Sequence, residues 1–305
     1  MKEQTFGVEI ECNGITRARA AKISAHYFGT DRSSDTSARN GYCAFSAWDQ
    51  KGREWKFVKD VSIEGRDDCK CEVVTPILNY DDLDLLQGLV RTLRKAGAKS
   101  DATRGCGVHI HIGASGMTAS NLRTLTNLMA SHENLLTDAL AISSSRTSSY
   151  CKPTDKNFLK VINDKKPQSM DAFKKIWYES QGSSLLSADR HYNGTRYHML
   201  NLHATFTKGT VEFRLFQFDA PSDGKMNGLH AGQLKAYIQF CLAICHKART
   251  TQFASHKVSA VQTENAKFAM RTWLNSLGMI GDEFQTAREV FTKRLTGNSA
   301  WRRSA

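Results

Sequence analysis

The sequence lacks the long apolar segments that are typical of membrane proteins. None of its 305 residues belongs to an apolar run of about 18 residues, so no transmembrane helix and no membrane partner are expected. The first residues form no apolar signal segment, and Glu9 and Glu11 interrupt the apolar residues that follow. These absences predict a cytoplasmic protein.

The common nucleotide and zinc motifs are also missing. The sequence contains no Gly-x-x-x-x-Gly-Lys motif and no kinase-type glycine loop, so any nucleotide must be held by another scheme. The pair Cys69 and Cys71 lacks the two-residue spacer and the second pair of a zinc site. Without a secretion signal, the eight cysteines are expected to be reduced thiols. Cys106 has no identifiable paired base, so we expect a small buried side chain rather than a nucleophile.

The chain has fewer acidic residues than basic ones, with 30 Asp and Glu against 42 Lys and Arg. The net charge of +12 and the pI near 9.3 favour anionic partners, among them nucleic acid, a nucleotide phosphate or an acidic substrate. Much of the excess lies near the C-terminus, where a solvated basic tail explains it as well as a binding site does. The basic residues of that region are Lys247, Arg249, Lys293, Arg294, Arg302 and Arg303.

What the chain does have is a histidine-bearing strand at residues 105–113, Gly-Cys-Gly-Val-His-Ile-His-Ile-Gly. The alternation of apolar residues with His109 and His111 predicts a strand that projects both imidazoles from one face. A strand with a merely polar outer face is the alternative. A ligand or catalytic role is favoured because histidine is the commonest metal ligand.

Carboxylates alternate in the same way on other predicted strands. Glu9 and Glu11 share one face of the first strand, and two glutamates side by side repel each other unless a cation or a basic group lies between them. Glu72 lies in a short strand, and Glu212 shares a strand face with Arg214. A solvated strand-end charge is the alternative for Glu11, and a hydrogen-bonded role without a metal is the alternative for His111.

The remaining pattern predicts an α+β protein with a mostly antiparallel sheet covered by helices. Strands are predicted at residues 5–12, 42–49, 53–61, 71–76, 197–202 and 210–218, with turns at 50–52 and 207–209. Helices are predicted at residues 17–28, 81–96, 118–141, 170–180, 223–247, 263–277 and 281–295. Thr118 is the predicted N-cap of the third helix, and Gly97 the C-cap of the second. Residues 30–41 read as a loop, and residues 143–193 as an irregular segment with one short helix.

This set of carboxylates and imidazoles predicts a cation site. Oxygen-rich ligands with one or two histidines suit Mg²⁺ or Mn²⁺ better than structural zinc. Such ions serve ATP phosphates, and Arg214 would add a permanent planar cation for a phosphate or carboxylate oxygen.

Several of these segments resemble the motifs of the amidoligases. This family of carboxylate–amine ligases belongs to the glutamine synthetase and glutamate–cysteine ligase superfamily and occurs in phages, bacteria and fungi. The resemblance covers roughly residues 5–220. The segments, in the order seen in the family, are Phe6-Gly7-Val8-Glu9-Ile10-Glu11, Asp60-Val61-Ser62, Glu72-Val73-Val74-Thr75-Pro76, Gly107-Val108-His109-Ile110-His111, Arg196 with Asn201, and Glu212-Phe213-Arg214.

The resemblance implies a glutamine synthetase-like catalytic fold, with a curved antiparallel sheet that binds ATP and Mg²⁺ or Mn²⁺. A substrate carboxylate would attack the γ-phosphate, and an amine would convert the acyl phosphate to an amide. Residues 1–220 would form the catalytic core, with a mobile insertion near 143–195 that includes a closing loop at 163–193. Residues 221–305 would form a helical part packed on the same domain. For a phage-encoded enzyme the compartment would be the host cytoplasm.

Roles follow from the matching motifs. Glu9, Glu11, Glu72 and His109 would bind metal, and Glu212 would close the metal site and take part in catalysis. Arg214 would stabilise phosphoryl charge as a catalytic group. The resemblance gives Arg196 a catalytic role in which it would hold nucleotide or acidic substrate, and places His111 and Asn201 at the cofactor. Asp60 and Ser62 would contact the amine substrate.

Two other functions remain open from the sequence. The same residues could serve a metal-dependent amide or peptide hydrolase that cleaves without ATP. The positive charge also fits a nucleic-acid-binding or nucleic-acid-modifying protein, although no recognised motif supports it. The sequence leaves the acid and amine substrates, small molecules or peptides, unidentified. It also leaves open the number of metals and the oligomeric state.

Overall fold

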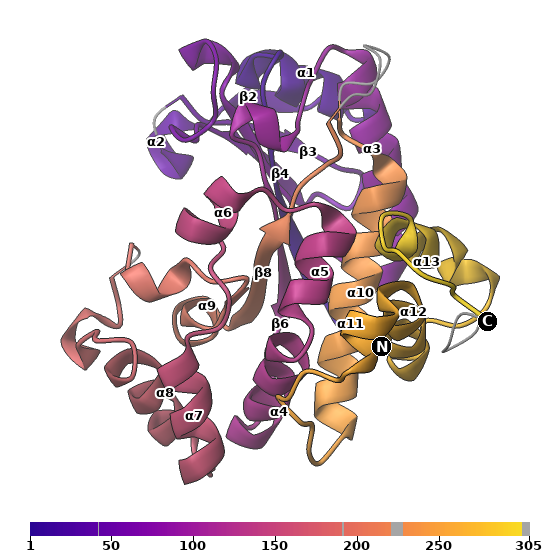
Figure 1. Ribbon diagram of the computed structural model, residues 1–305. Helices are drawn as coiled ribbons and strands as arrows, with labels where there is room; N and C mark the ends of the chain where they lie inside the picture. Colours follow the sequence, from indigo (N-terminus) through magenta and orange to yellow (C-terminus); the bar gives the residue numbers. More distant parts are fainter. Residues whose placement is uncertain (42, 191, 221–227, 301–305) are drawn as a thin grey trace. The chain divides into compact units, whose positions relative to one another are not determined.

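In the computed structural model, the alternating residues near the start of the chain form strand β1 (Phe6–Cys12) (Figure 1). Phe6, Val8 and Ile10 are each at most 2% exposed, so their face belongs to the core. β1 pairs antiparallel with β5 (Cys71–Val74). Because the register is set by this buried face, the polar residues of both strands fall on the opposite face together.

The structure describes residues 1–41, 43–190, 192–220 and 228–300. The contacts divide the chain into two units. The first unit holds Lys2–Ile110 and Phe216–Lys235, and the second holds Met1, His111–Leu215 and Ala236–Ala305. Strand β6 (Val108–Gly113) begins in the first unit and ends in the second.

The first unit contains the strand order β2-β3-β4-β5-β1-β6. The predicted hairpin is confirmed: β3 (Phe45–Trp48) pairs antiparallel with β4 (Glu54–Val58), and Gly52 turns the chain with a φ of +72°. The prediction of a loop at residues 30–41 is wrong. β2 (Ser33–Asp35) pairs with β3 there, and the short helix α2 (Ser37–Asn40) follows. Backbone pairing with β3 overrides the polar composition of the segment.

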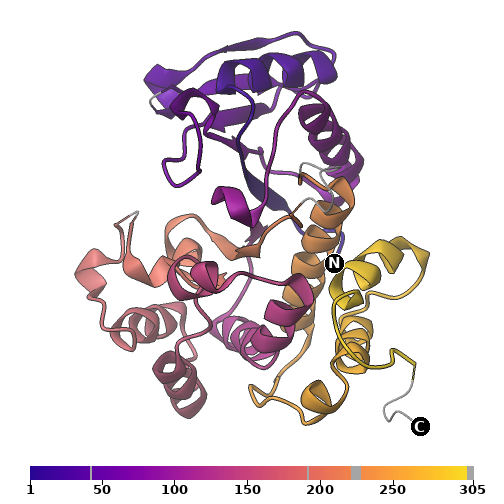
Figure 2. The ribbon, with the colours of Figure 1, turned by 45° about the horizontal axis from the view of Figure 1, so that its top comes forward.

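Two helices of the first unit were predicted and are confirmed. α1 (Arg17–Tyr27) packs against β2, β3 and β4 and is the indigo helix in Figure 2. α3 (Leu83–Lys95) packs against α1 and buries its leucine-rich face. It is followed by Gly97 with a φ of +104°, as expected for a residue that ends a helix.

In the second unit, β7 (Leu200–Asn201) pairs antiparallel with β8 (Thr210–Phe216), and β8 follows β6 in the strand order. The predicted strand at residues 197–202 is therefore shorter than expected. The connection is also more than a turn, because helix α9 (His203–Thr207) precedes Gly209, which has a φ of +68°.

The prediction of one helix at residues 118–141 is wrong. The chain forms α4 (Ala119–Ala130) and α5 (Glu133–Leu140), separated by Ser131 and His132. The hydroxyl of Ser131 donates to the carbonyl of Asn127 at 2.9 Å, and such local bonds compete with helix propagation. The predicted N-cap is confirmed, because the backbone N–H of Asn121 donates to the hydroxyl of Thr118 at 3.2 Å.

Residues 143–193 hold more helix than predicted. Besides the expected α8 (Met170–Glu179), the segment forms α6 (Ser144–Ser149) and α7 (Lys156–Lys165). Asp155 caps α7, and Phe158 packs edge-to-face against Phe173 and Trp177 of α8. Whether the segment moves during function stays a prediction.

The C-terminal helices follow the predicted order. α10 (Ala231–Thr250) is the long helix, and α11 (Val261–Glu264), α12 (Ala266–Ser276) and α13 (Gln285–Thr292) come after it. The predicted start of the long helix at residue 223, Tyr42 of the first hairpin, and Arg302 and Arg303 lie outside the described residues. Among the described ranges, no helix combines the length and the apolar character needed to cross a bilayer.

The predicted fold class, α+β with a curved, mostly antiparallel sheet covered by helices, is confirmed. The predicted domain boundary at residue 220 stays a prediction. The sheet matters for function because its antiparallel registers decide which polar side chains meet.

Candidate functional site

Two glutamates of the first unit lie directly opposite each other. Glu11 of β1 is the register partner of Glu72 of β5, and such pairs place Cβ atoms about 5 Å apart. The side chain of His109 in β6 completes the group, because ligand atoms of all three residues lie within 4.8 Å of one another. Like charges in this position are destabilising, so the arrangement favours a bound cation.

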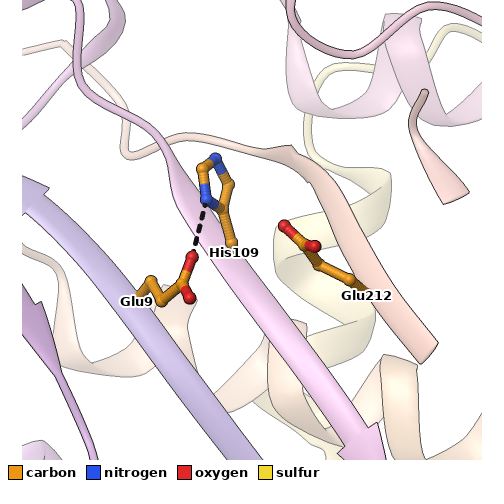
Figure 3. A group of neighbouring side chains, drawn as sticks. All are labelled: Glu9, His109 and Glu212. Carbon is orange, nitrogen blue, oxygen red and sulfur yellow. Dashed lines mark hydrogen bonds and ion pairs between the residues drawn. The ribbon is translucent and has the colours of Figure 1, made fainter. Parts of the chain in front are cut away.

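Glu9 adds a third carboxylate to this group. Figure 3 shows its Oε2 in a 3.2 Å hydrogen bond with Nδ1 of His109. The other ring nitrogen of His109, Nε2, lies 3.8 Å from Oε1 of Glu11. The imidazole therefore lies between two carboxylates of β1, and its side chain is buried.

Glu11 is held from two directions by residues that the sequence patterns did not single out for this role. The backbone N–H of Gly107 donates to Oε2 of Glu11 at 2.5 Å, and the hydroxyl of Ser100 donates to its carbonyl at 2.6 Å. Glu11 is 5% exposed, so the alternative of a solvated strand-end charge is wrong. Neither bond could be found from the sequence, because both join residues about 90 positions or more apart.

Asp60 and Ser62 form a turn after β4. The carboxylate of Asp60 accepts from the backbone N–H and the hydroxyl of Ser62 at 2.7 and 2.6 Å. The following backbone contacts the turn that precedes β6, because the backbone N–H of Glu64 donates to the carbonyl of Arg104 at 3.0 Å. A Cβ on Gly105 would lie 2.9 Å from the Ser62 carbonyl, so a larger residue does not fit there. The contact of Asp60 and Ser62 with a substrate stays a prediction.

In the second unit, Glu212 of β8 is the centre of a buried polar cluster. Its Oε1 accepts from Nη1 of Arg214 at 2.6 Å, and its Oε2 accepts from Nδ2 of Asn201 at 2.6 Å. The three side chains are between 1% and 6% exposed. A carboxylate oxygen can accept more than one bond, so these two bonds do not by themselves prevent Glu212 from ligating a cation.

His111 lies in the same unit, and its Nδ1 forms a 2.9 Å hydrogen bond with the hydroxyl of Thr210. Its Nε2 lies 3.9 Å from Oε1 of Glu212. The alternative of a strand with a polar outer face is wrong, because His109 and His111 are 6% and 8% exposed.

Tyr197 is a residue that the sequence analysis missed. The Cζ atoms of Arg196 and Arg214 each lie 5.7 Å from the centre of its ring, within the range of cation–π contact. Arg196 also lies 5.5 Å from the ring centre of Tyr192. An aromatic residue directly after Arg196 was the available signal.

The donor set of the first unit fits Mg²⁺ or Mn²⁺. Three carboxylates and one imidazole offer mainly hard oxygen atoms, whereas structural zinc sites are rich in cysteine. Burial raises the pKa of the Cys106 thiol well above its usual range, which disfavours the thiolate form that binds metals. Cys106 is fully buried, as expected of a packing residue.

The comparison with known families agrees with this chemistry. A family model described as "Putative amidoligase enzyme" matches residues 2–245, which is most of the chain. No curated protein matches the sequence.

Proposed function

The chain belongs to the amidoligase family, and from this premise we propose that it is an ATP- and Mg²⁺-dependent ligase that joins a carboxylate to an amine. The observation that carries the proposal is the pair of opposed glutamates, buried Glu11 and half-buried Glu72, completed by His109. This donor set suits the ion that ATP-dependent ligation requires, and Mn²⁺ could replace Mg²⁺ there.

The proposed reaction has two steps. A carboxylate oxygen of the first substrate attacks the γ-phosphorus of ATP, which releases ADP and forms an acyl phosphate. The amine nitrogen then attacks the acyl carbon, inorganic phosphate leaves, and the nitrogen loses a proton. A bound Mg²⁺ would neutralise the phosphate charge that otherwise repels the attacking carboxylate.

The protein's residues divide this work. We assign metal binding to Glu9, Glu11, Glu72 and His109, with Glu212 as a further metal ligand. The bond from Gly107 and the contact with His109 hold Glu11 in one orientation, which reduces the reorganisation needed when a metal binds.

We assign the stabilisation of the phosphoryl charge to the polar cluster of the second unit. Arg214 is permanently cationic and is aligned by Glu212, so its guanidinium can face an anionic oxygen without being reoriented. Arg196 would bind nucleotide, and His111 and Asn201 would support the same cofactor. We assign contact with the amine substrate to Asp60 and Ser62. The substrates are a small-molecule or peptide carboxylate and amine.

The test is ATP turnover by the purified protein with Mg²⁺, with pools of acids and amines, followed by mass spectrometry of the product. We expect ADP release that requires both an acid and an amine, and a product lighter by one water than the sum of its substrates. Glu9→Gln and Glu212→Gln should abolish turnover while the protein stays folded, because each removes a charged side chain that we assign to metal binding.

Glu179→Gln is the matched control, since its side chain is 54% exposed on α8. It should turn over ATP like the unmodified protein. Amide cleavage without ATP would overturn the ligase in favour of a metal-dependent hydrolase. Full activity of either site variant would overturn the metal-site assignment.

A further inference from the structure

A groove in the first unit lies away from the proposed metal ligands. It has a volume of about 640 Å³ and runs between α1 and α3. Its lining residues are Arg19, Lys22, Ile23, His26, Tyr27 and Thr92. The volume is within the range of ligand-binding clefts, and none of the residues assigned to the ligase reaction lines it.

The edge of the groove is positively charged. Arg19 and Lys22 are exposed and lie about 4.5 Å apart along the axis of α1. Arg91 of α3 is also exposed. It lies close to Tyr27, because its charge lowers the pKa of the tyrosine, which burial raises. None of these three cations forms an ion pair with a residue that the structure describes.

Negative groups offset only part of this charge. Asp31 pairs with His26 at 3.0 Å, which leaves that histidine already engaged. The negative charge of Asp84 on α3 raises the pKa of Tyr27, whereas the positive charge of Arg91 lowers it. Three cations against two carboxylates, Asp31 and Asp84, leave the groove positive, in line with the net charge of +12 for the chain.

The groove also contains a fixed aromatic ring. The hydroxyl of Tyr27 donates to the carbonyl of Leu85 at 3.0 Å. A Cβ on Gly88 would lie 1.9 Å from the Tyr27 hydroxyl, so α3 makes room for this side chain with a glycine. Tyr27 is therefore held in place and lines the groove beside the half-buried Ile23.

We propose that the groove between α1 and α3 binds a single-stranded nucleic acid. Arg19, Lys22 and Arg91 would contact phosphates, and the ring of Tyr27 would contact a base. Cations that follow a groove, together with an aromatic surface, are the features by which proteins bind single strands without sequence preference. An acidic polypeptide would use the cations but not the fixed ring, so it is the weaker match.

The experiment measures binding of a fluorescein-labelled 20-nucleotide oligo-dT by fluorescence anisotropy between 50 and 200 mM NaCl, without ATP. The double variant Arg19→Gln/Lys22→Gln should lower the affinity at 50 mM NaCl by about 10-fold or more. Each lost phosphate contact should also reduce the slope of log K against log salt by about 0.7, so the double variant should lose about 1.4.

The matched control is Lys156→Gln/Lys165→Gln on α7, which removes the same charge from exposed lysines. It should leave the affinity within about 2-fold and the slope unchanged. Tyr27→Leu should weaken binding by about 5-fold or more without changing the slope, and Tyr27→Phe should restore it, because phenylalanine keeps the stacking surface.

Three results would overturn the proposal. The first is no binding at 50 mM NaCl. The second is an equal loss in the α7 control, which would mean that only total charge matters. The third is equally effective competition by poly-glutamate, which would favour an acidic polypeptide. Because the assay contains no ATP, its failure and the failure of the ligase proposal are independent.

Discussion

Asn201 and Glu212 face each other across the β7–β8 pair, and the amide of Asn201 donates a 2.6 Å hydrogen bond to Oε2 of Glu212. Arg214 bonds the other carboxylate oxygen at 2.6 Å. A buried carboxylate needs such partners to offset its desolvation, and two donors on different oxygens also hold it in one orientation. The amide is therefore predicted to act on Glu212 rather than only on a cofactor.

Replacing Asn201 tests that role. Asn201→Leu keeps the volume but removes the donor, and a hydrogen bond to a charged group contributes about 1.5–3 kcal/mol. We expect a 10-fold or greater loss of ATP turnover. Asn201→Asp should lower the melting temperature further, because it places a second carboxylate opposite Glu212. Turnover assays and thermal unfolding measure both effects, and unchanged turnover in the leucine variant would refute the proposed role.

Tyr197 is predicted to position two guanidinium groups. Tyr197→Leu removes its cation–π contacts with Arg196 and Arg214, each worth about 0.5–1 kcal/mol, and should raise the KM for ATP several-fold. Tyr197→Phe keeps the ring and should behave like the unmodified protein. Tyr192→Leu is the comparison, because it removes a cation–π contact with Arg196 and leaves the ring of Tyr197 in place. Steady-state kinetics decide the matter, and a phenylalanine variant as impaired as the leucine variant would argue against it.

His132 is predicted to make stability pH-dependent. Burial lowers the pKa of this histidine to about 4, and its ring stacks on Trp273 with centres 3.8 Å apart. Between this value and the ordinary pKa of 6.5, the unfolded chain binds a proton that the folded chain does not, so stability falls as the pH falls.

The loss from this histidine between pH 7 and pH 4 amounts to about 3 kcal/mol. His132→Phe keeps a stacking ring but cannot titrate. Its free energy of unfolding should therefore depend less on pH between 4 and 6.5, although its stability at pH 7 is lower because the bond to Ser131 is lost. Urea unfolding at several pH values measures this slope, and identical slopes would contradict the prediction.

Asp82 is predicted to stabilise the first unit. Its carboxylate accepts two bonds from Arg53 at 2.7 and 3.0 Å and one from Lys51 at 3.0 Å. The guanidinium of Arg53 holds the pKa of Asp82 well below its ordinary value of 3.8, despite the opposing effect of burial. Asp82→Asn leaves Arg53 without this partner and should cost about 3 kcal/mol at neutral pH.

The sign of the pH effect follows from the lowered pKa. The stabilisation is fully present above about pH 4 and is lost as the pH falls toward the lowered value in the folded state. The difference in unfolding free energy between Asp82→Asn and the unmodified protein should therefore shrink in acid. Asp81→Asn, an exposed neighbour, should differ little at any pH. A gap that stays constant down to pH 2 would refute the account.

Local patterns in the sequence were sufficient for the elements that bear the candidate site. The alternation of Phe6, Val8 and Ile10 with Glu9 and Glu11 predicts β1, and the alternation around His109 and His111 predicts β6. The hairpin turn before Arg53 is equally local, since Gly52 and its neighbours define it. The order of the family's motifs then indicated the amidoligases, and the family match confirms this.

Partners that are distant in the chain could not be predicted in this way. The helical pattern continues to Leu140, and nothing in it indicated that Ser131 would interrupt the helix. The packing of Phe158 against α8 likewise depends on residues that no periodicity connects. The contact of Tyr197 with Arg214 joins two elements in the same way.

The sequence by itself determined which residues alternate, and therefore which side chains each strand can project from one face. The tertiary structure decided that Glu11 meets Glu72, that Gly107 holds Glu11, and that Asn201 meets Glu212. The physical reason is that side-chain direction follows from backbone geometry within a few residues, whereas strand register depends on burying the apolar faces of segments far apart in the chain.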